Sequence, residues 1–190
     1  MHCCSNDWHF QLQESHSRGR VASSSSNVTQ NRRSRMAGLT GLEIRIGTEQ
    51  DTELIRSIHL ELKRPSRDRY LAGEYLIAWL EGVAIGCAAT SVFGEGGYFY
   101  GLAVRRTWQR KGIGGELMEA RIEALRALRA EYAVALAMFW NSRFFRNHGF
   151  QPVKRQILPA SALHHSDLRN PALRRSAVML KWLRQTEGLN

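Results

Sequence analysis

Three apolar runs follow one another in the middle of the chain, separated only by short turns. The first, YLIAWL at 75–80, is joined by Glu81-Gly82 to the second, VAIGCAATSV at 83–92, and GEGG at 94–97 leads into the third, YFYGLAV at 98–104. A Glu-Gly link between apolar runs is a strong hairpin signal, and a glycine-rich turn lets the chain reverse again. The sequence therefore predicts a meander of three strands.

The segments around this meander alternate between strand-like and helix-like patterns. LEIRI at 42–46 alternates apolar and charged residues as a half-buried strand does, whereas the apolar residues after Asp51, a plausible N-cap, recur at helical spacing. The expected helices are 51–62, 113–130 and 142–148, and the further strands are 132–139, 150–157 and 176–183, with a loop at 159–175. This order predicts an α/β fold with a mixed, mostly antiparallel central sheet flanked by helices.

The two ends of the chain differ in composition from the part between them. Residues 1–40 contain SSSS at 23–26, scattered arginines and few aliphatic residues. We expect a disordered or weakly ordered N-terminal tail there, or an extension upstream of a start at Met36. The single domain is expected at 41–184, with a C-terminal tail at 185–190.

Cysteine usage and hydropathy bound the compartment and the cofactors. No apolar run approaches the roughly 20 residues that span a bilayer, so no membrane segment is expected. Cys3, Cys4 and Cys87 form no CxxC or Cys/His spacing, and the adjacent His164 and His165 cannot easily converge on one ion. We therefore expect no metal, no disulfide framework and a cytoplasmic protein.

A glycine-rich segment, QRKGIGG at 109–115, lies between the third run of the meander and the helix expected at 113–130. The first N–H groups of a helix have no intrahelical acceptor, and the helix dipole behind them favours an anion. Glycines allow a ligand to approach the backbone, while Arg110 and Lys111 add positive charge. The segment therefore predicts a phosphate-binding loop.

Two common phosphate motifs do not fit this loop. A nucleoside-triphosphate loop needs GxxxxGK[ST], which the sequence lacks. A dinucleotide fingerprint, GxGxxG, follows its strand closely, whereas RRTWQRK separates Val104 from Gly112, and Leu117 stands where a third small residue belongs. Neither a nucleoside triphosphate nor a dinucleotide is therefore the expected ligand.

The stretch LAVRRTWQRKGIGGELMEA at 102–120 resembles the acetyl-CoA-binding signature of the GNAT superfamily, the acyl-CoA-dependent N-acetyltransferases. Gln109, Gly112 and Gly114 match the pattern Q/R-x-x-G-x-G/A, and an apolar strand and HGF at 148–150 follow in the family's order. The matching order covers about 42–184. The resemblance implies transfer of an acetyl group from acetyl-CoA to a primary amine by direct attack in a ternary complex.

The resemblance also implies which positions hold the cosubstrate. Leu102 and Val104 stand where the family strand offers backbone groups to the pantetheine arm, and Phe144 and Phe145 lie on the helix that flanks this arm. The family sheet splays between the strands at 98–104 and 132–139 to form the thioester slot. The pyrophosphate is expected at Gln109, Arg110, Lys111, Gly112, Ile113, Gly114 and Gly115.

Catalytic residues are less clearly indicated. Many family members place a tyrosine, as the acid for the departing thiolate, four residues before the glycine of the GF pair, where this chain has Phe145. A base must also remove a proton from the attacking amine, because alkylammonium groups titrate near pH 10. The candidates for acid and base are Tyr98, Tyr100, Glu95 and His148, and a backbone N–H at Val104 is expected to polarise the thioester carbonyl. Packing, solvation and helix capping are the competing structural roles of these side chains.

The sequence does not identify the acceptor amine. FF-x-x-x-GF at 144–150 is similar to a subset of the superfamily that acetylates free amino acids or their analogues, although Trp140 and Asn141 do not match that subset. Such substrates carry a carboxylate, which arginines can bind. The candidate arginines are Arg67, Arg69 and Arg143, together with Arg146, Arg169, Arg174 and Arg175.

The net charge of +10 favours anionic partners, and several functions remain as alternatives. A small-molecule amine is the expected partner, with protein N-acetylation or acetyl-CoA binding without turnover as alternatives. Nucleic acid is the least expected partner, because RRSR at 32–35 stands without any recognisable nucleic-acid-binding motif. A homodimer is possible through exposed sheet edges.

Overall fold

The computed structural model describes residues 39–63, 72–163 and 165–184. Most of the expected N-terminal tail, the C-terminal tail and the candidate residues Arg67 and Arg69 lie outside these ranges. The described residues form two compact units. Unit 1 comprises the described residues up to Cys87 together with Leu102–Leu117, and unit 2 comprises Ala88–Gly101 and the described residues from Met118 onward.

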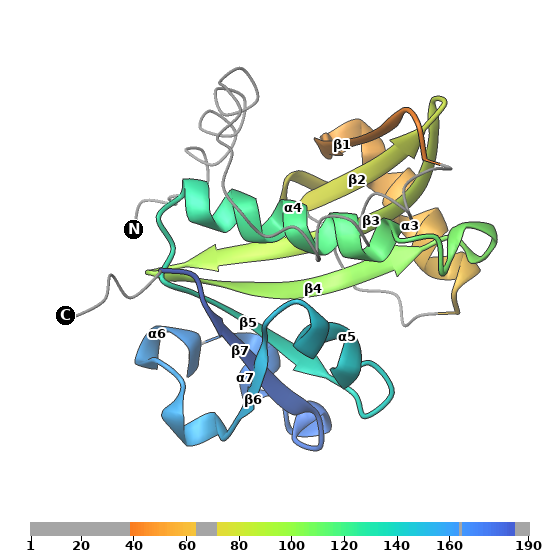
Figure 1. Ribbon diagram of the computed structural model, residues 1–190. Helices are drawn as coiled ribbons and strands as arrows, with labels where there is room; N and C mark the ends of the chain where they lie inside the picture. Colours follow the sequence, from red (N-terminus) through yellow and green to blue (C-terminus); the bar gives the residue numbers. More distant parts are fainter. Residues whose placement is uncertain (1–38, 64–71, 164, 185–190) are drawn as a thin grey trace. The chain divides into compact units, whose positions relative to one another are not determined.

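Seven strands form one sheet in the order β1-β2-β3-β4-β5-β7-β6 (Figure 1). The strands are β1 Leu42–Ile46, β2 Tyr75–Leu80, β3 Val83–Phe93, β4 Gly96–Val104, β5 Tyr132–Ala137, β6 Gln151–Val153 and β7 Ala177–Trp182. β1 pairs antiparallel with β2, and β7 pairs antiparallel with both β5 and β6, whereas β4 and β5 run parallel. The predicted α/β fold with a mostly antiparallel sheet is confirmed, and β2, β3 and β4 are the predicted meander.

The helices are α3 Thr52–Glu61, α4 Ile113–Ala127, α5 Ser142–Asn147, α6 Ala160–Leu163 and α7 Ser166–Arg169, with several 3-10 turns between them. Asp51 is the N-cap residue of α3, as the sequence predicts, but its side chain makes no capping hydrogen bond to this helix. Its carboxylate instead accepts from the backbone N–H and the hydroxyl of Thr48, at 2.8 and 2.9 Å, and closes a 3-10 turn at Glu49–Asp51. α3 begins directly after Asp51, at Thr52. It buries Ile55 and Ile58 on one face.

Unit 2 has its core between β4, β5 and α4. Phe99, Met118, Leu125 and Phe150 are among the buried side chains of this cluster. Arg121 on α4 is only 1% exposed, although it is charged. Its guanidinium donates to the carbonyl oxygens of Ala89 and Tyr100, and it lies 4.3 Å from the centre of the Phe99 ring.

The strand expected at 150–157 is much shorter in the structure. β6 ends at Val153, and residues Arg155–Ile157 form a 3-10 turn. The Arg155 guanidinium donates to the carbonyl oxygens of Leu168 and Leu173, both at 2.7 Å, and thereby holds the segment after β6 against α7. These contacts replace strand pairing. Their acceptors lie within 159–175, which the sequence predicts as a loop but which contains α6, α7 and a 3-10 turn in the structure.

In the described part of the chain, no helix is both long and apolar enough to cross a membrane.

Candidate active site

The loop between β4 and α4 carries the predicted phosphate motif in unit 1. A 3-10 turn at Arg106–Trp108 is followed by Arg110 and Gly112, both with positive φ, at 63° and 94°. The N–H groups of Gly115 and Glu116 both donate to the carbonyl oxygen of Gly112, at 2.8 and 3.1 Å. The N–H groups just before Gly115 therefore lie at the open N-terminus of a 15-residue helix, where an anion is stabilised.

Glycine is needed at position 112 because of the backbone conformation rather than because of crowding. A Cβ built on Gly112 meets nothing within 4 Å, but a φ of 94° is one that other L residues rarely adopt. Arg110, Lys111 and Gly112 are all exposed. The exposed backbone of the loop is thus accessible to a ligand.

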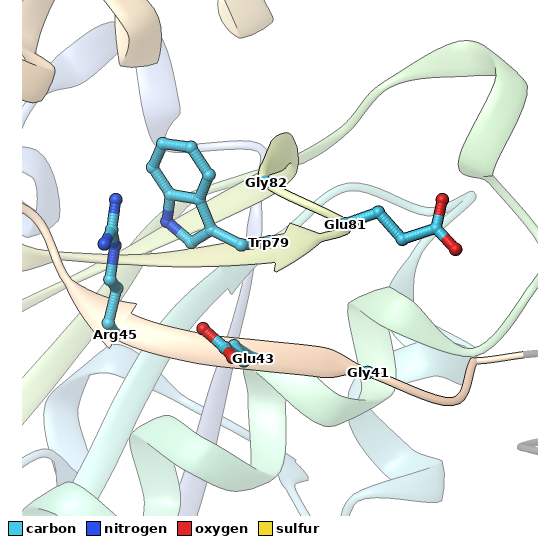
Figure 2. Close-up of a pocket in the computed structure, with 6 residues that line it drawn as sticks. All are labelled: Gly41, Glu43, Arg45, Trp79, Glu81 and Gly82. Carbon is cyan, nitrogen blue, oxygen red and sulfur yellow. The ribbon is translucent and has the colours of Figure 1, made fainter.

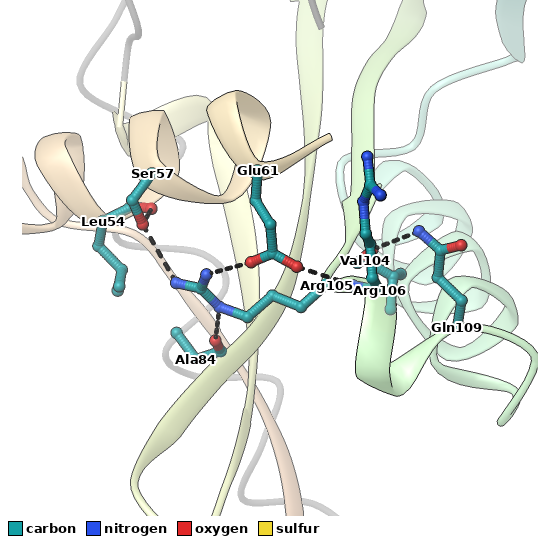
Figure 3. Close-up of polar contacts among 8 residues, drawn as sticks. All are labelled: Leu54, Ser57, Glu61, Ala84, Val104, Arg105, Arg106 and Gln109. Atoms are coloured by element: carbon teal, nitrogen blue, oxygen red, sulfur yellow. Dashed lines mark hydrogen bonds and ion pairs between the residues drawn. The ribbon is translucent and has the colours of Figure 1, made fainter. Parts of the chain in front are cut away.

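Gln109 anchors the start of this loop to the end of β4. Its amide Nε2 donates to the carbonyl oxygen of Val104 at 2.9 Å (Figure 3). The ammonium of Lys111 lies 4.4 Å from the centre of the Trp108 ring, a cation–π contact within the same loop. The motif's glutamine therefore has a structural role that its position in the sequence pattern did not reveal.

An ion pair holds the first residues of the loop to α3, and sequence reasoning missed it. The Arg105 guanidinium donates to Glu61 Oε2 at 2.6 Å, to the Ala84 carbonyl oxygen at 2.8 Å and to the Ser57 hydroxyl at 3.1 Å (Figure 3). The backbone N–H of Arg106 donates to Glu61 Oε1 at 2.9 Å. The Arg106 N–H and the Arg105 guanidinium lower the pKa of Glu61 below its ordinary value. Glu61 stands 44 residues before Arg105, so no local pattern could identify the pair.

β3 and β4 approach each other closely where the cosubstrate strand ends. A Cβ on Gly86 would lie 3.0 Å from the Ala103 carbonyl oxygen and 3.3 Å from Val104 Cγ2. A larger residue at 86 would therefore push on the backbone of β4 beside Val104. A glycine inside a strand-like run is the only sign of this contact in the sequence.

Leu102, Val104 and the residues from Gln109 to Gly115 all belong to unit 1. The remaining candidates that the structure describes belong to unit 2, and they fall into separate contacts. The recorded register of the parallel pair β4–β5 runs from Gly96↔Tyr132 to Phe99↔Ala135, while β4 continues to Val104. The sheet splay expected between these strands stays a prediction.

Tyr98 and Tyr100 lie on the same side of β4, as strand alternation predicts. Their rings stack with centroids 6.0 Å apart, and the His165 ring lies 4.2 Å from that of Tyr98. Tyr98 is 3% exposed, whereas Tyr100 is half-buried. Tyr98 thus packs between two rings, and the Tyr100 ring is the more accessible of the two.

Glu95 and His148 are each engaged with side chains that the sequence analysis did not link to them. The Ser161 hydroxyl donates to Glu95 at 3.0 Å and lies 2.5 Å from the Tyr132 hydroxyl. Burial raises the pKa of Tyr132. His148 Nδ1 lies 2.7 Å from Glu119 Oε1, which connects α5 to α4.

The short helix α5 presents its predicted residues in different ways. Phe145 is 7% exposed and packs against Phe150, with ring centroids 5.6 Å apart. Phe144 is only partly buried, and Arg143 is exposed. The aromatic residue at the usual tyrosine position is thus part of the core of unit 2.

A shallow pocket of about 280 Å³ lies on β1 and β2 of unit 1, lined by Gly41, Glu43, Arg45, Trp79, Glu81 and Gly82 (Figure 2). The Arg45 guanidinium covers the Trp79 ring at 4.1 Å from its centre. None of the predicted site residues lines this pocket. Among the described residues, no three His, Cys, Asp or Glu side chains are grouped so that they could hold a metal ion.

Comparison with known proteins identifies the family. The model of the acetyltransferase (GNAT) family matches residues 43–150, more than half of the chain. No curated protein sequence matches the chain.

Two solved structures of N-acetylglutamate synthase from Neisseria gonorrhoeae are similar to it, at 25% and 26% identity, both with a TM-score of 0.65 over 76% of this chain. One of these structures contains coenzyme A and L-arginine, and the other contains coenzyme A and N-acetyl-glutamate. The matched region spans only about a third of the synthase, 34% and 35% of its length.

Two further structures share the fold over nearly their whole length. Rv2747 from Mycobacterium tuberculosis, in complex with CoA, is 18% identical with a TM-score of 0.63, over 74% of this chain and 98% of its own. The ribosomal-protein-S18-alanine N-acetyltransferase from Escherichia coli is 17% identical with a TM-score of 0.56, over 78% of this chain and 97% of its own. The chain belongs to the acetyltransferase (GNAT) family.

Proposed function

We propose that this enzyme transfers an acetyl group from acetyl-CoA to the primary amine of a small molecule that carries a carboxylate, a free amino acid or an analogue of one. The observation that carries the donor half of the proposal is the loop between β4 and α4. It presents helix N-terminal N–H groups beside Arg110 and Lys111, and Gln109 and the Arg105–Glu61 pair fix its start. A pyrophosphate at Gly112–Gly115 suits these groups.

Charge supports the acceptor half of the proposal. Residues 132–184 contain nine lysines and arginines and a single acidic residue, Asp167, so this segment supplies most of the net charge of +10. A positive surface attracts a carboxylate and repels polyamines and aminoglycosides. The similarity to an N-acetylglutamate synthase at 25–26% identity points in the same direction.

The reaction needs three events at the thioester. The amine nitrogen attacks the carbonyl carbon and forms the C–N bond, the C–S bond breaks, and the proton lost from the amine is balanced by one gained at the departing thiolate. We propose that the Val104 N–H polarises the carbonyl and that Tyr100 is the acid. Tyr100 is chosen over Tyr98 because it is the less buried of the stacked pair.

His148 is the proposed base. If its Nδ1–H donates to Glu119, the lone pair lies on Nε2, where it can accept a proton from the amine or from an intervening water. Substitution His148→Gln keeps a polar group at this position and should lower kcat about 100-fold, with little change in acetyl-CoA affinity. An unchanged kcat would exclude His148 as the base.

The test of the proposed function is thiol release from acetyl-CoA across a panel of amines. The panel contains free amino acids, amino-acid amides, spermidine, an aminoglycoside and a lysine peptide. We expect release with free amino acids to exceed release with the other amines. Faster release with the lysine peptide would favour protein acetylation, and no release above hydrolysis with any amine would refute the proposal.

The same assay tests the acid. Tyr100→Phe should lower kcat about 100-fold, the effect expected when a general acid is lost, with little change in acetyl-CoA affinity. Tyr98→Phe is the matched control, because it removes a hydroxyl from the neighbouring ring of the same stack. Equal effects of the two substitutions would mean that neither hydroxyl acts as the acid.

A further inference from the structure

The turn after β5 exposes two adjacent aromatic side chains. The N–H of Asn141 donates to the Met138 carbonyl oxygen at 3.1 Å, which closes a turn with Phe139 and Trp140 at its centre. Phe139 is 88% exposed and Trp140 is 65% exposed, with ring centroids 4.8 Å apart. Met138 beside them is 40% exposed. We call residues 138–141 the aromatic turn.

This composition gives the turn no structural advantage. The central positions of tight turns favour proline, glycine, asparagine, aspartate or serine, and exposed aromatic surface is unfavourable in water. The side-chain oxygen of Asn141 is also buried without a hydrogen-bond partner among the residues that the structure describes. Contiguous exposed apolar surface of this kind marks a binding site.

Arginines adjoin the aromatic turn through β7. The Ser176 hydroxyl contacts Met138 Sδ at 3.3 Å, and Ala177 pairs with Ala137 at the end of β5. Arg174 and Arg175, just before Ser176, are both exposed. The segment that carries Arg174 and Arg175 thus runs directly into the residues that contact the aromatic turn, at one end of the β5–β7 pair.

We propose that the aromatic turn and Arg174 and Arg175 select the acceptor. The turn packs against an apolar side chain, and an arginine binds the α-carboxylate, so the acceptor is an α-amino acid with a large apolar side chain. This inference rests on the proposed function and narrows its substrate class. It makes Trp140 and Arg175 specificity-determining residues.

The charge around the turn argues for this class over two others. No acidic residue occurs between Glu131 and Asp167, so a cationic acceptor such as spermidine finds no carboxylate in the sequence around the turn. A nucleic acid would also use aromatic and basic groups, by base stacking and phosphate contacts. However, stacking on a single-stranded nucleic acid needs a platform for successive bases, and here the aromatic residues are confined to one turn.

The experiment pairs variants of the enzyme with matched acceptors. L-Phenylalanine, glycine and L-phenylalaninamide differ by a side chain or by a carboxylate, and kcat/KM is measured for each with saturating acetyl-CoA. In the wild type, we expect phenylalanine to exceed both glycine and the amide by about tenfold or more. Trp140→Ala should abolish the preference for phenylalanine over glycine. Arg174→Gln with Arg175→Gln should abolish the preference for phenylalanine over phenylalaninamide.

Lys154→Gln with Arg184→Gln is the charge-matched control, because both side chains are exposed and neither is a candidate for binding the acceptor, and it should preserve both preferences. If the wild type accepts amines but treats the three acceptors alike, or if the variants retain wild-type preferences, the inference is wrong and the proposed function stands. If no amine is acetylated, both fail. Tight binding of single-stranded RNA at physiological salt that is lost in the arginine variant would assign this surface to nucleic acid and overturn the inference.

Discussion

The loop after β4 and the aromatic turn after β5 follow the two parallel strands of the sheet, and they are built on opposite principles. The loop after β4 consists of glycines and basic residues, and hydrogen bonds and an ion pair hold its start. The aromatic turn has two large apolar side chains in water, at 88% and 65% exposure. The first region offers backbone groups to a ligand, and the second offers side chains.

This difference decides what can be inferred from sequence. A backbone site needs particular residues at particular spacing, because only glycine adopts a φ such as the 94° of Gly112 without strain. A side-chain surface needs only exposure, and exposure depends on which segments pack nearby. The sequence pattern predicts Phe139 as the end of a buried strand at 132–139, and the structure corrects this, because β5 ends at Ala137.

The largest effect is expected in the loop after β4. Gly112→Asp with Gly114→Asp places two carboxylates where the pyrophosphate is expected, and acetyl-CoA affinity should fall at least about 100-fold, or about 3 kcal/mol. Calorimetric titration with acetyl-CoA measures this change.

Gly41→Asp is the control for that substitution. Gly41 has a φ of 90°, close to the 94° of Gly112, and a Cβ at either position meets nothing within 4 Å. The backbone strain is therefore matched, and Gly41→Asp should leave acetyl-CoA affinity unchanged. Similar affinity losses in both proteins would mean that strain, rather than the anion site, explains the result.

An intermediate effect is expected at the ion pair that holds the loop. Glu61→Gln removes the charge that accepts from Arg105 and from the Arg106 N–H, and at pH 7 the free energy of unfolding should fall by about 2 kcal/mol. Glu53→Gln, on the same helix, breaks only a surface ion pair with Arg56, at 3.5 Å. It should change the free energy of unfolding by less than about 0.5 kcal/mol.

The Glu61 contribution also depends on pH in a defined direction. Because the folded state lowers the pKa of Glu61, the ionised carboxylate stabilises the fold above the unfolded pKa, near 4.3. That stability is lost as the pH falls through the lower folded pKa. Denaturant titrations should therefore give a higher free energy of unfolding for the wild type than for Glu61→Gln at pH 7. In strong acid the two free energies should be equal, and a difference that does not change with pH would contradict the assignment.

The smallest effect is expected in the aromatic turn. Phe139→Ala with Trp140→Ala removes exposed side chains, so the free energy of unfolding should change by no more than about 0.5 kcal/mol, and acetyl-CoA affinity should not change. Phe145→Ala, in the core of unit 2, should instead cost about 3–5 kcal/mol. A large loss of stability in the turn variant would show that the aromatic residues are structural.

Parts of the fold were predictable because local chemistry specifies them. Glu81 and Gly82 have φ values of 50° and 76°, so both central residues of the β2–β3 hairpin have the positive φ of a type I′ turn. The short strand β6 was not predictable in the same way, because Arg155 bonds to carbonyl oxygens at Leu168 and Leu173. An arginine in a strand-like run carries no local sign of such partners.

The sequence by itself determined the meander, the glycine loop at the start of α4 and the family, because each depends on residue types at short, regular spacing. Only the tertiary structure decided which distant groups meet. It joined Arg105 to Glu61, buried Arg121 against Phe99, and brought Ser176 to Met138 beside two exposed rings. Contacts across tens of residues arise from the packing of whole elements, and no local pattern encodes them.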